Sequence, residues 1–253
     1  MWKRNCTVLL GICFLLFLFV PLFFPYQQSY VSLPVEKSVS LKEIQTSLPT
    51  ILLDAGHGGF DGGSVALNGV IEKDINLAIA KKIKEQLVLL GFPVVMTRET
   101  DCSLEDDSGL SIRQRKVSDI HNREKLANSL AEPLLFLSIH QNKYEGASSF
   151  GTQIFYGCCR PESQEIAQFL QSFLRQELQP ENHREIKQGT SDIYLLKNLA
   201  CPAVLIECGF LSNEEDLEKL SNEEYQSQYA FAVSVGLLKY YTQETKDTAL
   251  NFG

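Results

Sequence analysis

Four side chains of this 253-residue sequence are of types that bind a metal or activate water. His57, His140 and Glu207 each stand at the end of a short apolar run, and Glu72 opens a helical pattern fifteen positions after His57. Two histidines and one carboxylate make a three-ligand zinc site with a fourth position left for water, which is the catalytic arrangement. A second glutamate nearby can serve as general base. The pattern therefore predicts a metal-dependent hydrolase.

The elements that must position these residues follow an α/β order. A strand over 50–53, a helix over 72–90 and a strand over 94–97 predict a βαβ unit, whose two strands are parallel. Within the helix an isoleucine or leucine recurs every four residues, and Gly91 follows its end.

The same reasoning predicts further strands and helices along the chain. The strands are at 134–139, 153–156, 193–196 and 203–206, and the helices at 111–130, 162–178 and 223–241. We expect a single α/β domain with a mostly parallel central sheet flanked by helices. Ligands bind beyond the carboxyl ends of parallel strands, so His57, His140 and Glu207 should converge there and form a catalytic zinc site.

The first 25 residues have a different composition from the rest. Lys3 and Arg4 precede an apolar run over 6–24, which is close to the length that crosses a bilayer, about 20 residues. No small-residue cleavage site follows, so an uncleaved membrane anchor helix is expected, with the rest of the chain outside the cytoplasm. The predicted organisation is a signal-anchor at 1–25, a linker at 26–48, a catalytic domain at 49–243 and a flexible tail at 244–253.

Charge and cysteine usage exclude some functions. The formal net charge of −8 argues against a nucleic-acid partner, because such binding depends on basic side chains that neutralise phosphates. Five of the seven cysteines lie outside the predicted anchor, and no Cys-x-x-Cys spacing occurs among them. The sequence therefore predicts neither a disulfide framework nor a four-cysteine zinc site. Free thiols fit a reducing or anoxic habitat.

Three other chemistries are alternatives to the metal site. The glycine-rich loop around His57 lacks the last glycine of a dinucleotide fingerprint and any following Gly-Lys-Ser/Thr, so nucleotide binding is disfavoured. Cys208, next to Glu207, is a candidate nucleophile, although a cysteine in a buried strand is more often inert packing. A serine hydrolase is disfavoured because no Gly-x-Ser-x-Gly elbow is present.

Four motifs resemble those of the zinc-dependent N-acetylmuramoyl-L-alanine amidases of the bacterial cell wall, in order and over about residues 50–241. They are Asp54-Ala55-Gly56-His57-Gly58-Gly59, Glu72, Ser138-Ile139-His140-x-Asn142 and Glu207-x-Gly209-Phe210-Leu211-Ser212-Asn213. The stretches at 96–101, 115–119 and 192–195 look most like those of the sporulation members of that family.

The resemblance implies a role for each residue that matches a motif. His57, Glu72 and His140 would hold one zinc ion per chain, and Glu207 would be the catalytic acid/base. Asn142 is a candidate for orienting the substrate. Arg98 and Arg123 are candidate contacts for stem-peptide carboxylates.

The resemblance also implies a substrate and a biological setting. The substrate would be peptidoglycan of the spore cortex, where removal of the stem peptide precedes muramic-δ-lactam formation. The resemblance implies a lipoprotein partner that activates the enzyme, as in relatives of some spore-formers, but no stretch of this sequence identifies its surface. The catalytic domain would lie in the cell wall or the forespore intermembrane space, or be secreted if the N-terminal segment is cleaved. The alternatives are a vegetative amidase for cell separation and an inactive, membrane-anchored wall-binding protein.

Overall fold

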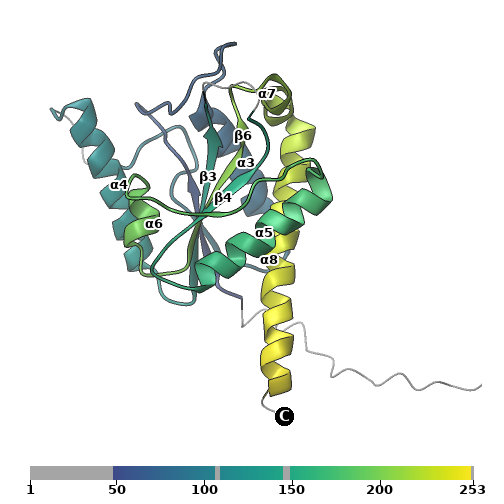
Figure 1. Ribbon diagram of the computed structural model, residues 1–253. Helices are drawn as coiled ribbons and strands as arrows, with labels where there is room; N and C mark the ends of the chain where they lie inside the picture. The colour runs from purple at the N-terminus through teal and green to yellow at the C-terminus, as the bar shows by residue number, and fades with distance from the viewer. Residues whose placement is uncertain (1–47, 106–108, 145–148, 252–253) are drawn as a thin grey trace, which may run out of the picture. The chain divides into compact units, whose positions relative to one another are not determined.

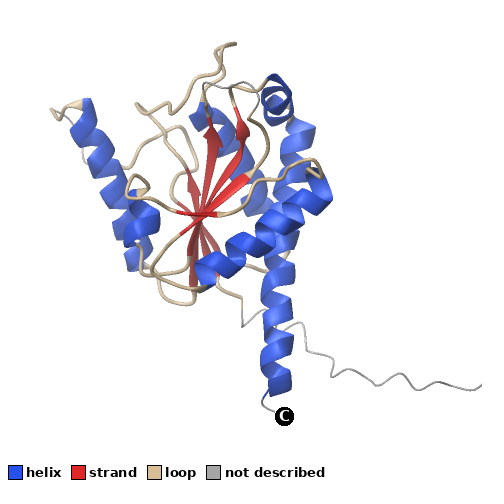
Figure 2. Cartoon of the chain, in the orientation of Figure 1, coloured by secondary structure: helices blue, strands red, loops and turns tan. Residues whose placement is uncertain are grey.

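A six-stranded sheet lies between two layers of helices in the computed structural model, which describes residues 48–105, 109–144 and 149–251 (Figures 1 and 2). The strands are β1 (Thr50–Ala55), β2 (Val94–Met96), β3 (Leu134–Asn142), β4 (Gln153–Tyr156), β5 (Lys187–Gln188) and β6 (Ala203–Phe210). The helices are α3 (Glu72–Leu89), α4 (Ile112–Ser129), α5 (Glu162–Leu178), α6 (Tyr194–Asn198), α7 (Glu214–Ser221) and α8 (Glu223–Asn251).

The strand order is β2-β1-β3-β6-β4-β5, and the pairings β1–β2, β1–β3, β3–β6 and β4–β5 are parallel. Only the pairing between β4 and β6 is antiparallel among the described strands. The predicted single α/β domain with a mostly parallel sheet is therefore confirmed for the described residues.

Alternate residues of each central strand enter two different cores. Leu135 and Leu137 of β3 pack in the core under α3, α5 and α8, whereas Phe136 packs in the core under α4 and α6. This alternation is the period of two that any strand imposes. Because helices cover both faces, the strands are apolar on both, as parallel sheets usually are.

Helix α3 carries Glu72 to the site because of where it begins. Its buried face repeats every four residues through Ile75, Ile79, Ile83 and Leu87, which fixes the helix against the sheet and α8. The chain leaves the carboxyl end of β1 through the glycine-rich loop, so the first residue of α3 lies at that same end of the sheet.

Some boundaries and one element differ from the prediction. The expected strand at 193–196 is wrong: the segment forms α6, whose Leu196 packs on the sheet without pairing to it. A short apolar run does not distinguish a strand from a buried helical turn. Two short elements were not predicted. Strand β5 has only two residues, and Asn213 caps α7 by accepting a hydrogen bond from the backbone N–H of Asp216.

Strands β3 and β6 extend further than predicted, to Asn142 and Phe210. His140 and Glu207 therefore lie inside these strands, near their carboxyl ends. Helix α8 likewise runs past residue 241. The predicted anchor at 1–25 and nearly all of the predicted linker lie outside the described residues. None of the described helices is long and apolar enough to cross a membrane.

Candidate metal centre

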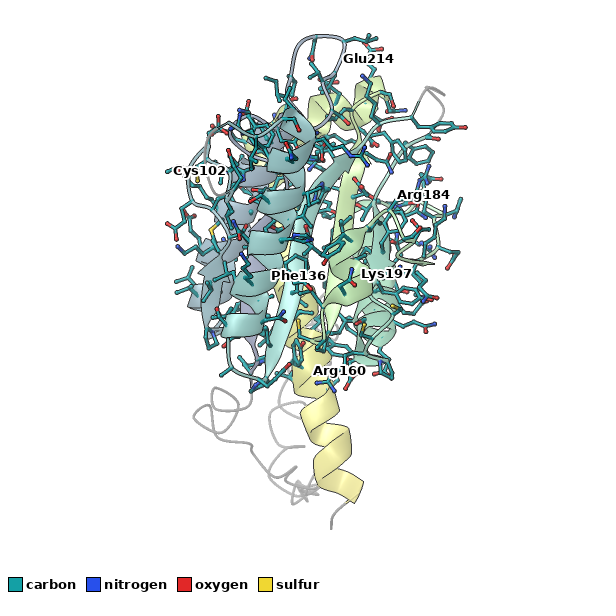
Figure 3. All side chains as sticks on the ribbon, turned by 90° about the vertical axis from the view of Figure 1, so that its left-hand side faces the viewer. Cys102, Phe136, Arg160, Arg184, Lys197 and Glu214 are labelled. Carbon is teal, nitrogen blue, oxygen red and sulfur yellow. The ribbon has the colours of Figure 1, made fainter. Side chains whose placement is uncertain are left out.

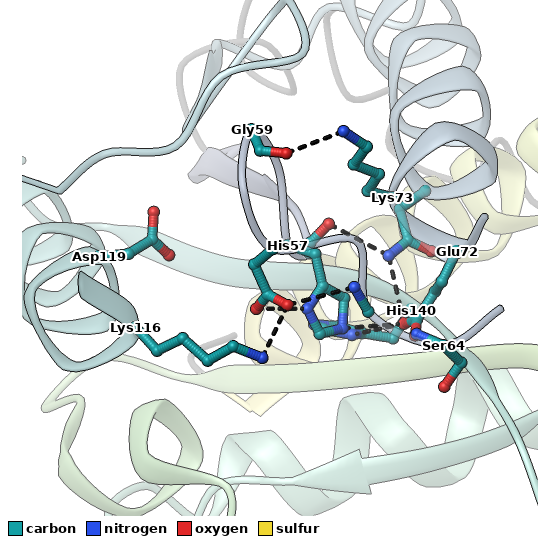
Figure 4. A network of polar contacts seen from close by, with 12 residues as sticks. His57, Gly59, Ser64, Glu72, Lys73, Lys116, Asp119 and His140 are labelled. Carbon is teal, nitrogen blue, oxygen red and sulfur yellow. Dashed lines mark hydrogen bonds and ion pairs between the residues drawn. The ribbon is translucent and has the colours of Figure 1, made fainter. Parts of the chain in front are cut away.

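Three donor side chains from three elements meet at the carboxyl end of the sheet (Figure 4). His57 comes from the loop after β1, Glu72 from the first turn of α3 and His140 from β3. Their ligand atoms all lie within 4.8 Å of one another. Glu72 Oε1 lies 3.2 Å from His57 Nε2 and 3.1 Å from His140 Nδ1.

This spacing suits a tetrahedral metal ion. Two ligand atoms that each lie about 2.0–2.1 Å from one tetrahedral zinc ion are about 3.3 Å apart. The separations of Glu72 Oε1 from the two imidazole nitrogens are close to that value. Two imidazoles and one carboxylate also form a donor set typical of catalytic zinc. The three residues therefore fit a divalent metal of this kind.

The backbone at His57 is held in an unusual conformation that aims its ring. His57 has a φ of 60°, and among the described residues it is the single non-glycine residue with positive φ. Asp61 Oδ2 lies 2.9 Å from His57 Nδ1, and Arg123 Nη2 donates to the His57 carbonyl at 2.8 Å. With Nδ1 bound to Asp61, Nε2 is the nitrogen that faces Glu72.

The Glu72 carboxylate is buried and oriented by neutral donors. The backbone N–H of Ser64 donates to Oε2 at 2.8 Å, and that of Gln141 donates to Oε1 at 3.1 Å. The Asn76 amide donates to Glu72 Oε1 at 3.3 Å and to the Gly56 carbonyl at 3.2 Å. Gln141 Nε2 in turn donates to Asn76 Oδ1 at 3.1 Å. Asn76 and Gln141, which were not predicted as site residues, thus connect the three segments that carry the ligands.

Charges and hydrogen bonds within the cluster shift the pKa values of its members. Burial disfavours the imidazolium form of His57, but hydrogen bonds and charges from Asp61 and Glu72 outweigh it and raise its pKa to about 9. Burial opposes ionisation of Glu72 as well, yet the two histidines hold the pKa of Glu72 well below its usual range. Because histidine binds a metal ion through a deprotonated nitrogen, metal binding at His57 is favoured as the pH rises.

Glu207 lies beside this cluster on the neighbouring strand. It is paired in register with His140 across β3 and β6, strands that run about 4.8 Å apart. Its Oε2 is buried and has no hydrogen-bond partner among the described residues. Burial raises the pKa of Glu207 to about 7. A carboxyl group with such a pKa can accept or donate a proton near neutral pH.

Two glycines are needed beside the metal-binding side chains because a Cβ atom at either position would overlap them. A Cβ atom on Gly56 would lie 2.2 Å from His140 Nε2. A Cβ on Gly63, where φ is 69°, would lie 2.6 Å from both Glu72 Oε2 and His57 Cδ2. Larger residues at these positions would displace the donor side chains.

The structure places both predicted arginine contacts inside the protein. Arg98 and Arg123 are each 3% exposed. Arg98 donates to the carbonyls of Ala55 and Gly56 at 2.9 and 3.0 Å, and Arg123 forms an ion pair with Asp54. Their guanidinium groups brace the loop that carries His57, so this geometry does not support the prediction that they bind stem-peptide carboxylates.

Asn142 and Cys208, the two other residues that the sequence indicated, have different surroundings. Asn142 is half-buried at the end of β3, and its carbonyl accepts a hydrogen bond from the N–H of Leu211 at 2.8 Å. Cys208 is fully within the core under α3 and α8, and burial raises the pKa of its thiol to about 12. Such a thiol is a poor nucleophile. The structure therefore supports the packing interpretation of Cys208.

The chain belongs to the N-acetylmuramoyl-L-alanine amidase family of the Amidase_3 type, whose model matches residues 51–239. This match confirms the family that the four motifs predicted.

Individual relatives agree with that assignment. Over 194 residues the chain is 37% identical to the germination-specific N-acetylmuramoyl-L-alanine amidase of Bacillus subtilis, covering 77% of this chain and 80% of the relative. The CwlD amidase of Clostridioides difficile, solved in complex with the GerS lipoprotein, is 41% identical, with a TM-score of 0.72 over 76% of this chain and 98% of that one. The amidase AmiC2 of Nostoc punctiforme is 27% identical with a TM-score of 0.63, over 78% and 98% of the two chains.

Replacing Gly56 tests the geometry of the cluster. We expect Gly56→Ala to weaken zinc binding at least tenfold, because the new methyl group must push the His140 ring out of its position. Competition with a chromophoric chelator measures this affinity. Gly62→Ala is the matched control in the same loop, since its Cβ would meet only an Ile71 methyl group at 3.2 Å. Equal zinc affinities of the two variants would contradict the proposed arrangement.

Proposed function

We propose that this protein is a zinc-dependent amidase that hydrolyses the amide bond between N-acetylmuramic acid and L-alanine in peptidoglycan. Membership of the amidase family establishes the class of hydrolase. The observation that supports zinc dependence is the convergence of three donor side chains beside the buried carboxyl group of Glu207.

His57, Glu72 and His140 would hold one zinc ion per chain. The metal would supply Lewis-acid chemistry, polarising the amide carbonyl and making water more acidic. Asp61 fixes the His57 ring through Nδ1, and Asn76 and Gln141 fix Glu72, so hydrogen bonds within the protein orient the donor side chains. Preorganised donors of this kind lower the entropy cost of binding.

Glu207 would move the proton that hydrolysis requires. Its Oε2, which has no hydrogen-bond partner within the described part of the chain, can accept a proton from the attacking water, and the protonated carboxyl can then deliver that proton to the leaving nitrogen of L-alanine. A pKa near neutrality suits both halves of this transfer. Asn142, at the end of the adjacent strand, is proposed to orient the substrate.

Replacing Glu207 tests this role. Glu207→Gln keeps the shape of the side chain but cannot accept the proton, so we expect zinc content to stay stoichiometric while kcat falls about 10²- to 10⁴-fold. Metal analysis and release of stem peptides from peptidoglycan measure the two properties. Glu177→Gln, an exposed position on α5, is the control for loss of one negative charge. Undiminished turnover by Glu207→Gln would rule out the assignment.

For cellular organisation we propose a signal-anchor at 1–25 and a linker at 26–48, followed by the catalytic domain at 49–243 and a tail at 244–253. The support is the apolar run after Lys3 and Arg4. The catalytic domain would then lie outside the cytoplasm, in the cell wall or the forespore intermembrane space, or be secreted after cleavage.

We also propose a role in maturation of the spore cortex, where the product would feed muramic-δ-lactam formation. Similarity to a germination-specific amidase and to CwlD supports this setting. Because that CwlD was solved with the GerS lipoprotein, we propose a lipoprotein partner for this chain as well. A vegetative amidase for cell separation is the alternative. The presence of all four key residues speaks against an inactive wall-binding protein.

Spores made without this protein test the biological role. We expect their cortex to lack muramic-δ-lactam, with recovery when the full chain is restored but not when Glu207→Gln is. Muropeptide analysis gives the δ-lactam level, and affinity purification of the restored chain from sporulating cells shows whether a lipoprotein accompanies it. Normal δ-lactam together with unseparated daughter cells would favour the vegetative role instead.

A further inference from the structure

Two neighbouring cysteines lie against the carboxyl end of α6. Strand β4 ends at Tyr156, and Cys158 and Cys159 follow it, both exposed and both free. Their Sγ atoms lie 3.7 and 3.3 Å from the carbonyl oxygen of Lys197, the penultimate residue of α6. Figure 3 labels Lys197 together with Arg160, the residue after the pair. Successive side chains of a strand point to opposite faces, but these two thiols follow the strand and meet at one atom.

The thiols supply hydrogen-bond donors that the end of a helix needs. The last carbonyl groups of a helix have no partner inside it. In α6 the Leu196 carbonyl accepts from the backbone N–H of Cys158 at 3.3 Å, and the Lys197 carbonyl accepts from the thiols of Cys158 and Cys159. A helix of five residues has too few internal hydrogen bonds to be stable alone. The conformation of α6 therefore depends on contacts such as these.

Helix α6 also forms one wall of the cavity beside the metal centre. Tyr194 and Leu196 line this cavity, as does Glu207. The Tyr194 hydroxyl donates to Glu124 Oε2 of α4 at 3.0 Å, so the first residue of α6 is tied to α4. The cysteine pair holds the other end of the helix. A chemical change at the cysteines therefore reaches the cavity through little more than one turn of helix.

Exposure and proximity suit the pair to disulfide exchange. Both thiols are accessible to a small reagent. Desolvation and a hydrogen bond with the Cys158 thiol raise the pKa of the Cys159 thiol, so the two groups are in contact. Neighbouring Cα atoms are about 3.8 Å apart, whereas those of disulfide-bonded residues are usually about 4.4–6.8 Å apart. A disulfide between neighbours is therefore strained, and a strained disulfide is readily reduced again.

We propose that Cys158 and Cys159 form a reversible modification site, at which a small-molecule disulfide oxidises the two thiols to a vicinal disulfide and frees the Lys197 carbonyl. The thiolate of one cysteine attacks a sulfur of the small disulfide, which forms a mixed disulfide and expels one thiolate. The thiolate of the other cysteine then attacks the cysteine sulfur of the mixed disulfide and expels the second thiolate. The pair loses two electrons and two protons, and the small disulfide becomes two thiols. The product has no S–H donor for the end of α6.

Oxidised glutathione tests this site on the zinc-loaded full chain. We expect mass spectrometry to show the loss of two hydrogen atoms from the proteolytic fragment that holds both cysteines. Hydrogen exchange at the Lys197 and Leu199 amides, which donate within α6, should become about fivefold faster, the effect expected from losing one hydrogen bond. A phosphine reductant should reverse both changes. Release of stem peptides should fall about fivefold in parallel, a consequence that rests on the proposed amidase function.

Serine variants separate the pair from the other thiols. Cys158→Ser and Cys159→Ser each leave a hydroxyl donor for the end of α6 but cannot form the linkage, so oxidised glutathione should no longer accelerate exchange in α6. Cys102→Ser removes an exposed thiol elsewhere and is the matched control, which should respond like the unaltered chain.

Two results would overturn the proposal. One is the formation of glutathione adducts without a linkage between Cys158 and Cys159, and the other is a linkage that leaves exchange in α6 unchanged. The proposed function fails separately. If the reduced, zinc-loaded enzyme with its lipoprotein partner releases no stem peptide while the linkage and the exchange behave as expected, the amidase function is wrong and the modification site stands.

Discussion

The buried carboxylate of Glu72 is the interaction on which the site depends. Removing a charge from water costs several kcal/mol unless it is paired and hydrogen-bonded. Here the cost is offset by contacts from the glycine-rich loop, α3 and β3. They are the imidazoles of His57 and His140, the backbone N–H groups of Ser64 and Gln141, and the amide of Asn76. Satisfying one charge therefore fixes the glycine-rich loop, the start of α3 and the end of β3 relative to one another. A metal ion bound by His57, Glu72 and His140 would be held by the arrangement built around that carboxylate.

A second buried charge supports the first. Asp54 at the end of β1 accepts hydrogen bonds from Ser138 at 2.6 Å and Thr97 at 2.8 Å and forms an ion pair with Arg123. Arg123 then reaches the carbonyl of His57. The left-handed backbone of His57 is thus held by a charge network in which the Arg123 guanidinium donates to Asp54, Asp119 and backbone carbonyls. Buried ion pairs often contribute little to stability, and here we infer that the network's value is the position it gives to His57.

The sequence was most informative where a periodic pattern or a residue type had one physical meaning. The four-residue repeat of α3 predicted that helix to within one residue, and apolar runs ending in His57, His140 and Glu207 predicted where those residues converge. It failed where tertiary contacts decide. An arginine is normally exposed, and Arg123 is buried because it pairs with Asp54, 69 positions away, as well as with Asp119 on its own helix. The run at 193–196 forms α6 because its apolar side chains cover the sheet rather than extend it.

The claim that these three residues hold zinc is tested most directly by X-ray absorption at the zinc edge on the full chain loaded with one equivalent of metal. The account predicts nitrogen and oxygen ligands only, at about 2.0–2.1 Å, with the outer-shell scattering of two imidazoles. Cys102, Cys158 and Cys159 are exposed free thiols and are the competing ligands. Sulfur scattering at about 2.3 Å would contradict the account, because it would place the metal away from His57, Glu72 and His140.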